Sequence, residues 1–207
     1  MKEFWDDRYD KESFIYGTEP SVYIKKQLPL LKPGKILFPA EGEGRNAVFA
    51  AQLGWQVHAF DFSTKGKEKA QKLAQTHHVQ IDYRIQSFMN EQYKAEEFDT
   101  ICMASVHFEP SIKMQMLKRL DSYLKIGGFF IIDAFNKKHR ALNKTNPALG
   151  GPPDEEMMFS AYEIKLAFSH YEIIELKEEL AEIKEGSGHV GKCELIRFIG
   201  KKISHSE

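Results

Sequence analysis

The feature that most constrains the fold is a regular alternation of short apolar runs with longer amphipathic segments. Apolar runs of roughly four to eight residues are typical of strands covered on both faces, and strands that alternate with helices predict a mostly parallel sheet between two helical layers. The alternation stops near the C-terminal end, where the runs 171–180 and 192–200 have only a loop between them. Without a helix to carry the chain across the sheet, these two runs should pair antiparallel. We therefore expect an α/β domain whose sheet ends in an antiparallel hairpin.

The same patterns give the bounds of the individual elements. Pro110 is expected in the first turn of a helix, where its missing N–H is harmless, and Gly127-Gly128 should end that helix. We expect one domain over 1–207, with an N-terminal segment over 1–34 and a long loop over 136–158 that we interpret as a lid. Further strands are expected over 35–40, 56–60, 80–85, 99–104 and 129–134, and helices over 45–53, 64–75, 110–124 and 160–168.

The composition argues against a nucleic-acid or membrane partner. The formal net charge is −1, and the one basic cluster, 137–140, is more typical of a solvated loop than of a phosphate-binding patch. No apolar run reaches about 18 residues, and the first residues are too polar for a signal peptide. Cys102 and Cys193 lie in apolar runs without metal-ligand spacing, which predicts buried, reduced thiols. We expect a soluble cytoplasmic protein without a metal site.

A glycine-rich turn separates the first predicted strand from the first predicted helix. Gly42, Gly44 and Ala47 satisfy the G-x-G-x-x-G/A pattern of nucleotide-binding turns, and ligands of open α/β sheets bind where this turn lies. Asp61 ends the next predicted strand, 17 residues after Gly44. We interpret Asp61 as the acceptor for ribose hydroxyls; the alternative is a helix N-cap, a role that Ser63 or the residue after it fills better.

Two carboxylates beside the turn indicate which nucleoside is bound. NAD would place its pyrophosphate at the helix N-terminus, where Glu41 and Glu43 would repel it. S-adenosylmethionine carries no phosphate, and Glu41 could attract its positive sulfonium and α-ammonium groups. We therefore favour S-adenosylmethionine and keep an NAD-dependent oxidoreductase as the alternative.

Several sequence motifs resemble one family. The turn Glu-Gly-Glu-Gly-Arg-Asn-Ala over 41–47 resembles motif I of class I S-adenosylmethionine-dependent methyltransferases, and especially the tellurite-resistance and thiopurine methyltransferase-like branch. The resemblance spans nearly the whole chain. It also includes Trp-Asp-Asp-Arg-Tyr over 5–9, Tyr-Gly-Thr-Glu-Pro over 16–20, Leu-Lys-Ile-Gly-Gly over 124–128, Gly-Gly-Pro over 150–152 and Glu-Gly-Ser-Gly-His-Val-Gly over 185–191.

The resemblance implies a fold and a set of cofactor contacts. The fold would be a Rossmann-like three-layer sandwich with seven strands, the seventh antiparallel and inserted between the fifth and sixth. The family would place the methionine end near the glycine turn, the adenine after the third strand and the sulfonium after the fourth. The implied contacts are Glu41, Gly42, Gly44 and Asn46 at the methionine end, Asp61 and Phe62 at the ribose, Ser87 and Phe88 at the adenine, Ala104 to His107 near the sulfonium, and Trp5 and Tyr16 as a cover.

The strand before the turn departs from the family pattern. Many relatives carry an aspartate and a glycine where this chain has Phe38 and Ala40, and Pro39 between them removes one ladder donor. This leaves Glu41 as the expected polar anchor for the cofactor.

The reaction implied is in-line methyl displacement onto a small molecule, in which the protein aligns the groups and excludes water. His107 is the candidate general base, or else a residue that orients its loop. His189 and Tyr16 are candidate substrate contacts, although His189 could instead hold the hairpin turn, and His77-His78 should lie on the surface. The resemblance suggests a thiol or a chalcogen oxyanion as acceptor. A module that binds S-adenosylmethionine without transferring methyl is the non-enzyme alternative.

Overall fold

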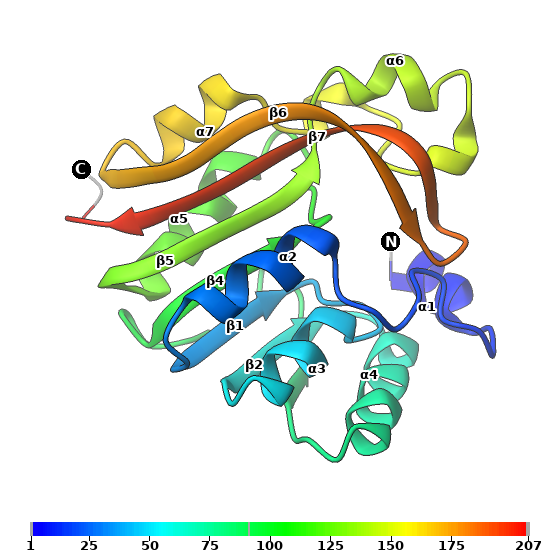
Figure 1. Ribbon diagram of the computed structural model, residues 1–207, viewed down its shortest axis with the longest axis horizontal. Coiled ribbons are helices and arrows are strands. Elements are labelled where there is room, and N and C mark those ends of the chain that lie inside the picture. Colours follow the sequence, from blue (N-terminus) through cyan, green and yellow to red (C-terminus); the bar gives the residue numbers. More distant parts are fainter. Residues whose placement is uncertain (1, 91, 206–207) are drawn as a thin grey trace.

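A single seven-stranded sheet runs through the molecule. The computed structural model describes residues 2–90 and 92–205, and its strand order is β3-β2-β1-β4-β5-β7-β6. The first five strands are parallel, whereas β7 pairs antiparallel with both β5 and β6, as expected (Figure 1). The strands are β1 (Lys35–Pro39), β2 (Gln56–Asp61), β3 (Asp82–Ile85), β4 (Phe98–Ala104), β5 (Leu124–Phe135), β6 (Tyr171–Glu185) and β7 (His189–Lys202).

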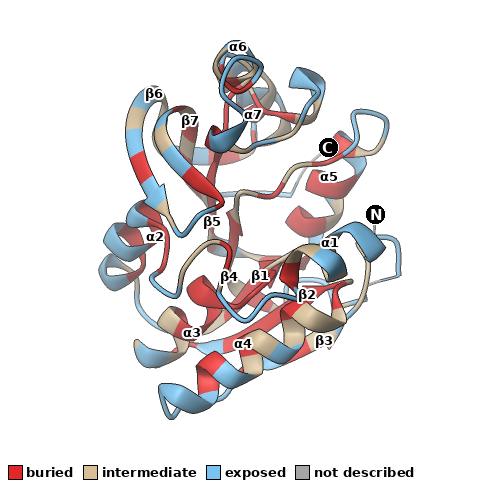
Figure 2. Ribbon diagram, turned by 90° about the vertical axis from the view of Figure 1, so that its right-hand side faces the viewer, coloured by how far each residue is buried: buried red, intermediate tan, exposed pale blue. Residues whose placement is uncertain are grey.

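Helices cover both faces of the sheet, which gives the three expected layers. The helices α2, α3 and α4 pack on one face through a cluster that contains Ile36 and Phe38, and α5 and α7 pack on the other through a cluster that contains Leu37 (Figures 1 and 2). Neighbouring residues of β1 thus point to opposite layers, as the two-residue period of a strand requires. The helices are α1 (Lys2–Tyr9), α2 (Val22–Gln27), α3 (Arg45–Gln52), α4 (Thr64–Thr76), α5 (Lys113–Tyr123), α6 (His139–Asn143) and α7 (Ala161–Ala167).

Three expected boundaries were wrong. Pro110 lies in a hydrogen-bonded turn before α5, since Ile112 and Lys113 both donate to the Glu109 carbonyl, and the helix begins only at Lys113. Gly127-Gly128 does not separate a helix from a strand; β5 begins at Leu124 and runs through both glycines across a shift in its register with β4. The terminal hairpin is longer than expected, because β6 continues to Glu185 and leaves only residues 186–188 for the turn.

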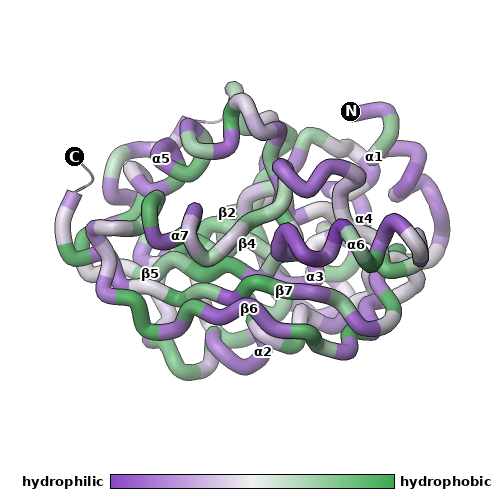
Figure 3. The backbone as a smooth tube through the Cα atoms, turned by 90° about the horizontal axis from the view of Figure 1, so that it is seen from above, coloured by the Kyte–Doolittle hydropathy of each residue, from purple (hydrophilic) through white to green (hydrophobic). Residues whose placement is uncertain are grey.

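The hairpin forms the outer edge of the sheet and bends over its carboxyl end. β6 alternates hydrophilic with hydrophobic residues along this edge (Figure 3), and charged side chains on an edge strand oppose pairing with another sheet. Its base is fixed by Lys202, which is 1% exposed and donates to the Asp121 carbonyl at 2.8 Å and carboxylate at 3.2 Å. The Tyr171 hydroxyl donates to the same carboxylate at 2.6 Å. These contacts tie both hairpin strands to the end of α5.

The segment 136–158 contains structure of its own. It holds α6 and two short 3-10 helices, Pro147–Leu149 and Glu155–Met157. The Asn143 side chain donates to the carbonyls of Gly150 and Pro152, which closes the segment on itself. Across residues 2–90 and 92–205, no helix is long and apolar enough to cross a membrane.

Candidate functional site

The glycine turn follows β1 at the carboxyl end of the sheet. Gly42 and Gly44 have φ angles of +61° and +88°, which glycine adopts without strain. A Cβ atom at Gly42 would lie 2.6 Å from the Tyr9 hydroxyl, and one at Gly44 would lie 2.5 Å from the Ala70 side chain. Close approach and backbone conformation therefore both require glycine in this turn.

The Glu41 side chain accepts hydrogen bonds from backbone amides at the start of α3. Its Oε1 atom accepts hydrogen bonds from the backbone of Asn46 and Ala47, both at 2.8 Å. Burial raises the pKa of Glu41 to about 7, against the lowering effect of these two amides. A phosphate bound at this helix would need the donors that Glu41 already uses. These amides are therefore not available to a pyrophosphate while Glu41 accepts from them.

Asp61 lies beside the turn at the end of β2. Its carboxylate accepts from the backbone of Gly42 at 3.1 Å and of Ser63 at 2.8 Å. The N-cap of α4 is Ser63, whose hydroxyl accepts from the Gly66 amide, so Asp61 is not needed as the cap. Burial raises the pKa of Asp61 to about 6. The half-buried Phe62 follows it directly.

The residues expected near the adenine come after β3. The Phe88 ring packs against Phe60 and Phe108 with centroid distances of 5.1 Å and 4.7 Å. Its carbonyl accepts from Arg119, and the Ser87 carbonyl accepts from the Asn90 amide. These contacts fix the Phe88 ring in an apolar cluster with Phe60, a residue of β2.

The N-terminal segment lies over the glycine turn. Glu43, which is 3% exposed, accepts from the amides of Ile15 at 2.9 Å and Tyr16 at 3.3 Å and pairs with Lys69 at 2.8 Å. Tyr9 lies against Gly42, and the Trp5 ring is 5.4 Å from the Tyr9 ring. Glu43 thus anchors the cover; the sequence showed only that it flanks the turn.

Residues 104–107 form the turn after β4. Ser105 has a φ of +55° and donates to the Asp133 carbonyl at 2.7 Å. The His107 ring stacks between Phe135 and Phe159, with centroid distances of 5.6 Å and 6.0 Å. Burial lowers the pKa of His107 to about 3. Its ring is therefore neutral near pH 7 and only weakly basic.

His189 lies opposite this turn, on the hairpin. Its Nδ1 atom is 3.1 Å from the Glu185 carboxylate, which also pairs with Arg45 at 2.8 Å, and its ring lies 4.6 Å from the Tyr16 ring. Burial would raise the pKa of Glu185, but His189 and Arg45 outweigh it and lower the pKa to about 2. A Cβ atom at Gly150 would lie 2.3 Å from the His189 ring, so the ring packs here only because the Gly-Gly-Pro motif has no side chain at this position.

A chain of buried polar groups, which the sequence analysis missed, links the turn to β5. The Asn46 side chain accepts from the Ser21 amide at 2.9 Å, and the Ser21 hydroxyl donates to Asp133 at 2.5 Å. Arg197 donates to the other Asp133 oxygen at 3.3 Å. A cavity of about 20 Å³ lies between Asp133, Arg197 and Ser105, and a void of this size holds about one water. The one sequence signal was an aspartate within the apolar run of β5.

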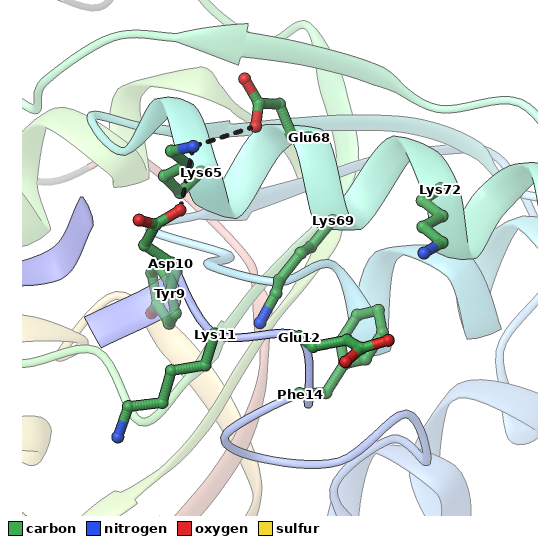
Figure 4. Close-up of a pocket in the computed structure, with 9 residues that line it drawn as sticks. All are labelled: Tyr9, Asp10, Lys11, Glu12, Phe14, Lys65, Glu68, Lys69 and Lys72. Atoms are coloured by element: carbon green, nitrogen blue, oxygen red, sulfur yellow. Dashed lines mark ion pairs between the residues drawn. The ribbon is translucent and has the colours of Figure 1, made fainter. Parts of the chain in front are cut away.

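A larger hollow of about 330 Å³ lies outside this site. It opens between the N-terminal segment and α4 and is lined by Lys65, Lys69, Lys72, Glu68 and residues 9–12 and 14 (Figure 4). Most of these side chains are charged and face solvent. His77 and His78 are likewise exposed, as expected, and Cys102 and Cys193 are buried free thiols. Among the described residues, no cluster could hold a metal ion.

The comparisons with known proteins give one matching family model and several similar folds. Residues 36–128 match the family described as a methyltransferase domain, and no curated protein matches the chain. A structure from work on the conversion of a disulfide bond into a thioacetal group during echinomycin biosynthesis is similar, with 18% identity, coverage of 100% of this chain and 94% of that one, and a TM-score of 0.74.

Two further solved structures share the fold. The magnesium protoporphyrin IX methyltransferase ChlM from Synechocystis PCC 6803, with bound S-adenosylhomocysteine, has 16% identity, 97% coverage of both chains and a TM-score of 0.71. TehB from Haemophilus influenzae has 16% identity and a TM-score of 0.70, and the match covers 97% of this chain and 66% of TehB.

Ala40 adopts a φ of +48°. A side chain in this left-handed region costs on the order of 1 kcal/mol. We expect Ala40→Gly to raise the free energy of unfolding by about 1 kcal/mol in urea titrations. The control Ala51→Gly, inside α3, should instead lower it by about 1 kcal/mol. Destabilisation by both changes would contradict this interpretation.

Proposed function

We propose that the chain is a class I S-adenosylmethionine-dependent methyltransferase that methylates a small molecule at a soft nucleophilic atom, a thiol or a chalcogen oxyanion. We also propose that it belongs with the tellurite-resistance and thiopurine methyltransferase-like branch, which the motifs at both ends of the chain support. TehB, of the same fold, is one structural neighbour among several.

The observation that carries the cofactor's placement is the Glu41 carboxylate. One of its oxygens accepts from two amides at the start of α3, and the carboxylate supplies the negative charge that would pair with an α-ammonium group. We propose that Glu41, Gly42, Gly44 and Asn46 hold the methionine end, Asp61 and Phe62 the ribose, Ser87 and Phe88 the adenine, and Ala104 to His107 the surroundings of the sulfonium. An NAD-dependent oxidoreductase does not fit, because its pyrophosphate would compete with Glu41 for the same donors.

When bound, the cofactor supplies an electrophilic methyl group. The protein's share is to orient the acceptor and keep water away from it. We propose that Tyr16, His107 and His189 line the acceptor site, where the neutral His107 ring between two phenylalanines offers a hydrogen bond rather than a strong base. We further propose that the segment 136–158 closes over it, since Gly150 packs against His189.

Between the two acceptor classes, the ion pairs favour a thiol. Two arginines flank His189 and Asp133, and both are already paired. Arg45 pairs with Glu185, and Arg197 pairs with Asp133 and Glu179. An oxyanion that binds Arg45 or Arg197 would have to displace one of these carboxylates, at the cost of leaving a buried charge unpaired. A thiol needs no cation, and its own ionisation near neutral pH makes a strong base unnecessary.

Turnover with a panel of acceptors tests this proposal. We expect formation of S-adenosylhomocysteine with an aromatic and an aliphatic thiol, and at least about tenfold less with selenite or tellurite, because Arg45 and Arg197, the arginines nearest His189 and Asp133, are already paired with carboxylates. The Asp61→Ala variant, with weakened cofactor binding, should be slow with every acceptor. Turnover with the oxyanions alone, or with neither class, would contradict the thiol proposal.

The raised pKa of Glu41 makes cofactor binding pH-dependent. The folded protein without cofactor holds a proton on Glu41 below about pH 7, and a cationic ligand favours its release. We expect the affinity for S-adenosylmethionine to rise about tenfold from pH 6 to pH 8 and then to level off. Titration calorimetry of the protein and of Glu41→Gln checks this. The variant should bind weakly at both pH values, and an unchanged pH dependence in the variant would contradict the assignment to Glu41.

A further inference from the structure

Arg8 is a cation beside the site, and it has no carboxylate partner among residues 2–90 and 92–205. Its guanidinium lies 5.9 Å from the Trp5 ring centroid and 5.7 Å from that of Tyr16, and its Nε atom donates to the Tyr16 hydroxyl at 3.3 Å. In the described part of the chain, Arg8 makes no ion pair and its two terminal nitrogens donate to nothing. The aromatic rings hold the guanidinium in place without neutralising it.

Three cations around the glycine turn with little exposed surface are already paired. Lys69 binds Glu43, and Arg45 binds Glu185 with the arginine side chain only 8% exposed. Arg197 binds Asp133 and Glu179. An anionic group that enters this site would therefore meet one unpaired guanidinium, that of Arg8.

The position of Arg8 relates it to the methionine end. It precedes Tyr9, whose hydroxyl lies against Gly42, and it bonds Tyr16, whose amide Glu43 holds over the turn. Figure 1 shows α1 beyond the carboxyl ends of β1 and β2, beside the turn between β6 and β7. Arg8 is thus fixed from both sides within the cover of the glycine turn.

The chemistry of the cofactor calls for such a group. S-adenosylmethionine has one negative group, the carboxylate of its methionine end. Helix N-termini often bind anions, but here Glu41 already uses the amides of Asn46 and Ala47. A guanidinium, by contrast, offers two parallel donors that match a carboxylate.

We propose that Arg8 binds the carboxylate of the cofactor's methionine end and so couples cofactor binding to the position of α1. The proposal rests on S-adenosylmethionine occupying the site described above. In this arrangement Glu41 faces the ammonium group of the cofactor's methionine end and Arg8 faces its carboxylate. Each charge of the methionine end then has an oppositely charged partner.

Calorimetric titration with two ligands tests the proposal without turnover. The ligands are S-adenosylhomocysteine and the analogue that lacks only its carboxylate. The native protein should bind S-adenosylhomocysteine roughly 10–100-fold more tightly than the analogue, as expected for a charge-assisted, two-donor contact. Arg8→Ala should lose most of this preference while its affinity for the analogue stays within about threefold. Arg8→Lys should keep part of the preference.

The variants also separate this role from a merely structural one. Lys11→Ala, which removes a nearby exposed cation, should leave both affinities unchanged, and thermal melting checks that each variant is folded. Equal weakening of both ligands by Arg8→Ala would show that Arg8 only packs the cover, and would overturn the proposal. A native protein with no preference between the ligands would also overturn it. Failure of the native protein to bind either ligand would instead remove the cofactor site itself, and the proposal with it.

Discussion

The site depends on one contact, in which the Glu41 carboxylate accepts hydrogen bonds from two backbone amides of α3. This contact satisfies donors that a helix N-terminus otherwise leaves free, and it places a negative charge where nucleotide-binding turns usually receive a phosphate. The left-handed φ of Gly42 and Gly44 lets the chain turn around it. The same contact puts a carboxylate at the helix end that a cation would stabilise. The raised pKa of Glu41 reflects the free energy cost of burying its negative charge when no cation is paired with it.

Segments far apart in the sequence meet around this turn because two further carboxylates, those of Glu43 and Glu185, bind groups on other segments. Glu43 binds the backbone of Ile15 and Tyr16, and Ser187 and Gly188 donate to the Ile15 carbonyl. Glu185 joins the hairpin to α3 through Arg45. The cover and the hairpin turn therefore form one wall, and both are fixed to the glycine turn and α3. Breaking one of these buried pairs would leave an uncompensated charge, which explains why the wall depends on all of them.

The sequence was sufficient for features set by local pattern. The element order, the glycine turn, Asp61 at the end of β2 and the antiparallel hairpin all follow from spacing and periodicity, and the structure confirms them. The predicted start of α5 was wrong because Pro110 is also accommodated by a turn before the helix. The predicted start of β5 was wrong because a strand can run through two glycines at a register shift.

The remaining features depend on long-range contacts. The bond between Ser21 and Asp133 joins residues 112 positions apart, and no local pattern announces it. The basicity of His107 depends on its burial between Phe135 and Phe159, which come from two other segments. The sequence identified the residue, but only the packing shows that its ring is a weak base.

The central claim is that this turn binds a sulfur nucleoside and not a dinucleotide. Calorimetric titration of the purified protein with S-adenosylhomocysteine, S-adenosylmethionine and NADH, alongside Asp61→Ala, tests it most directly. Micromolar binding of the first two, absent for NADH and weakened in the variant, is the predicted result. Binding of NADH, or of neither sulfur nucleoside, would contradict the account.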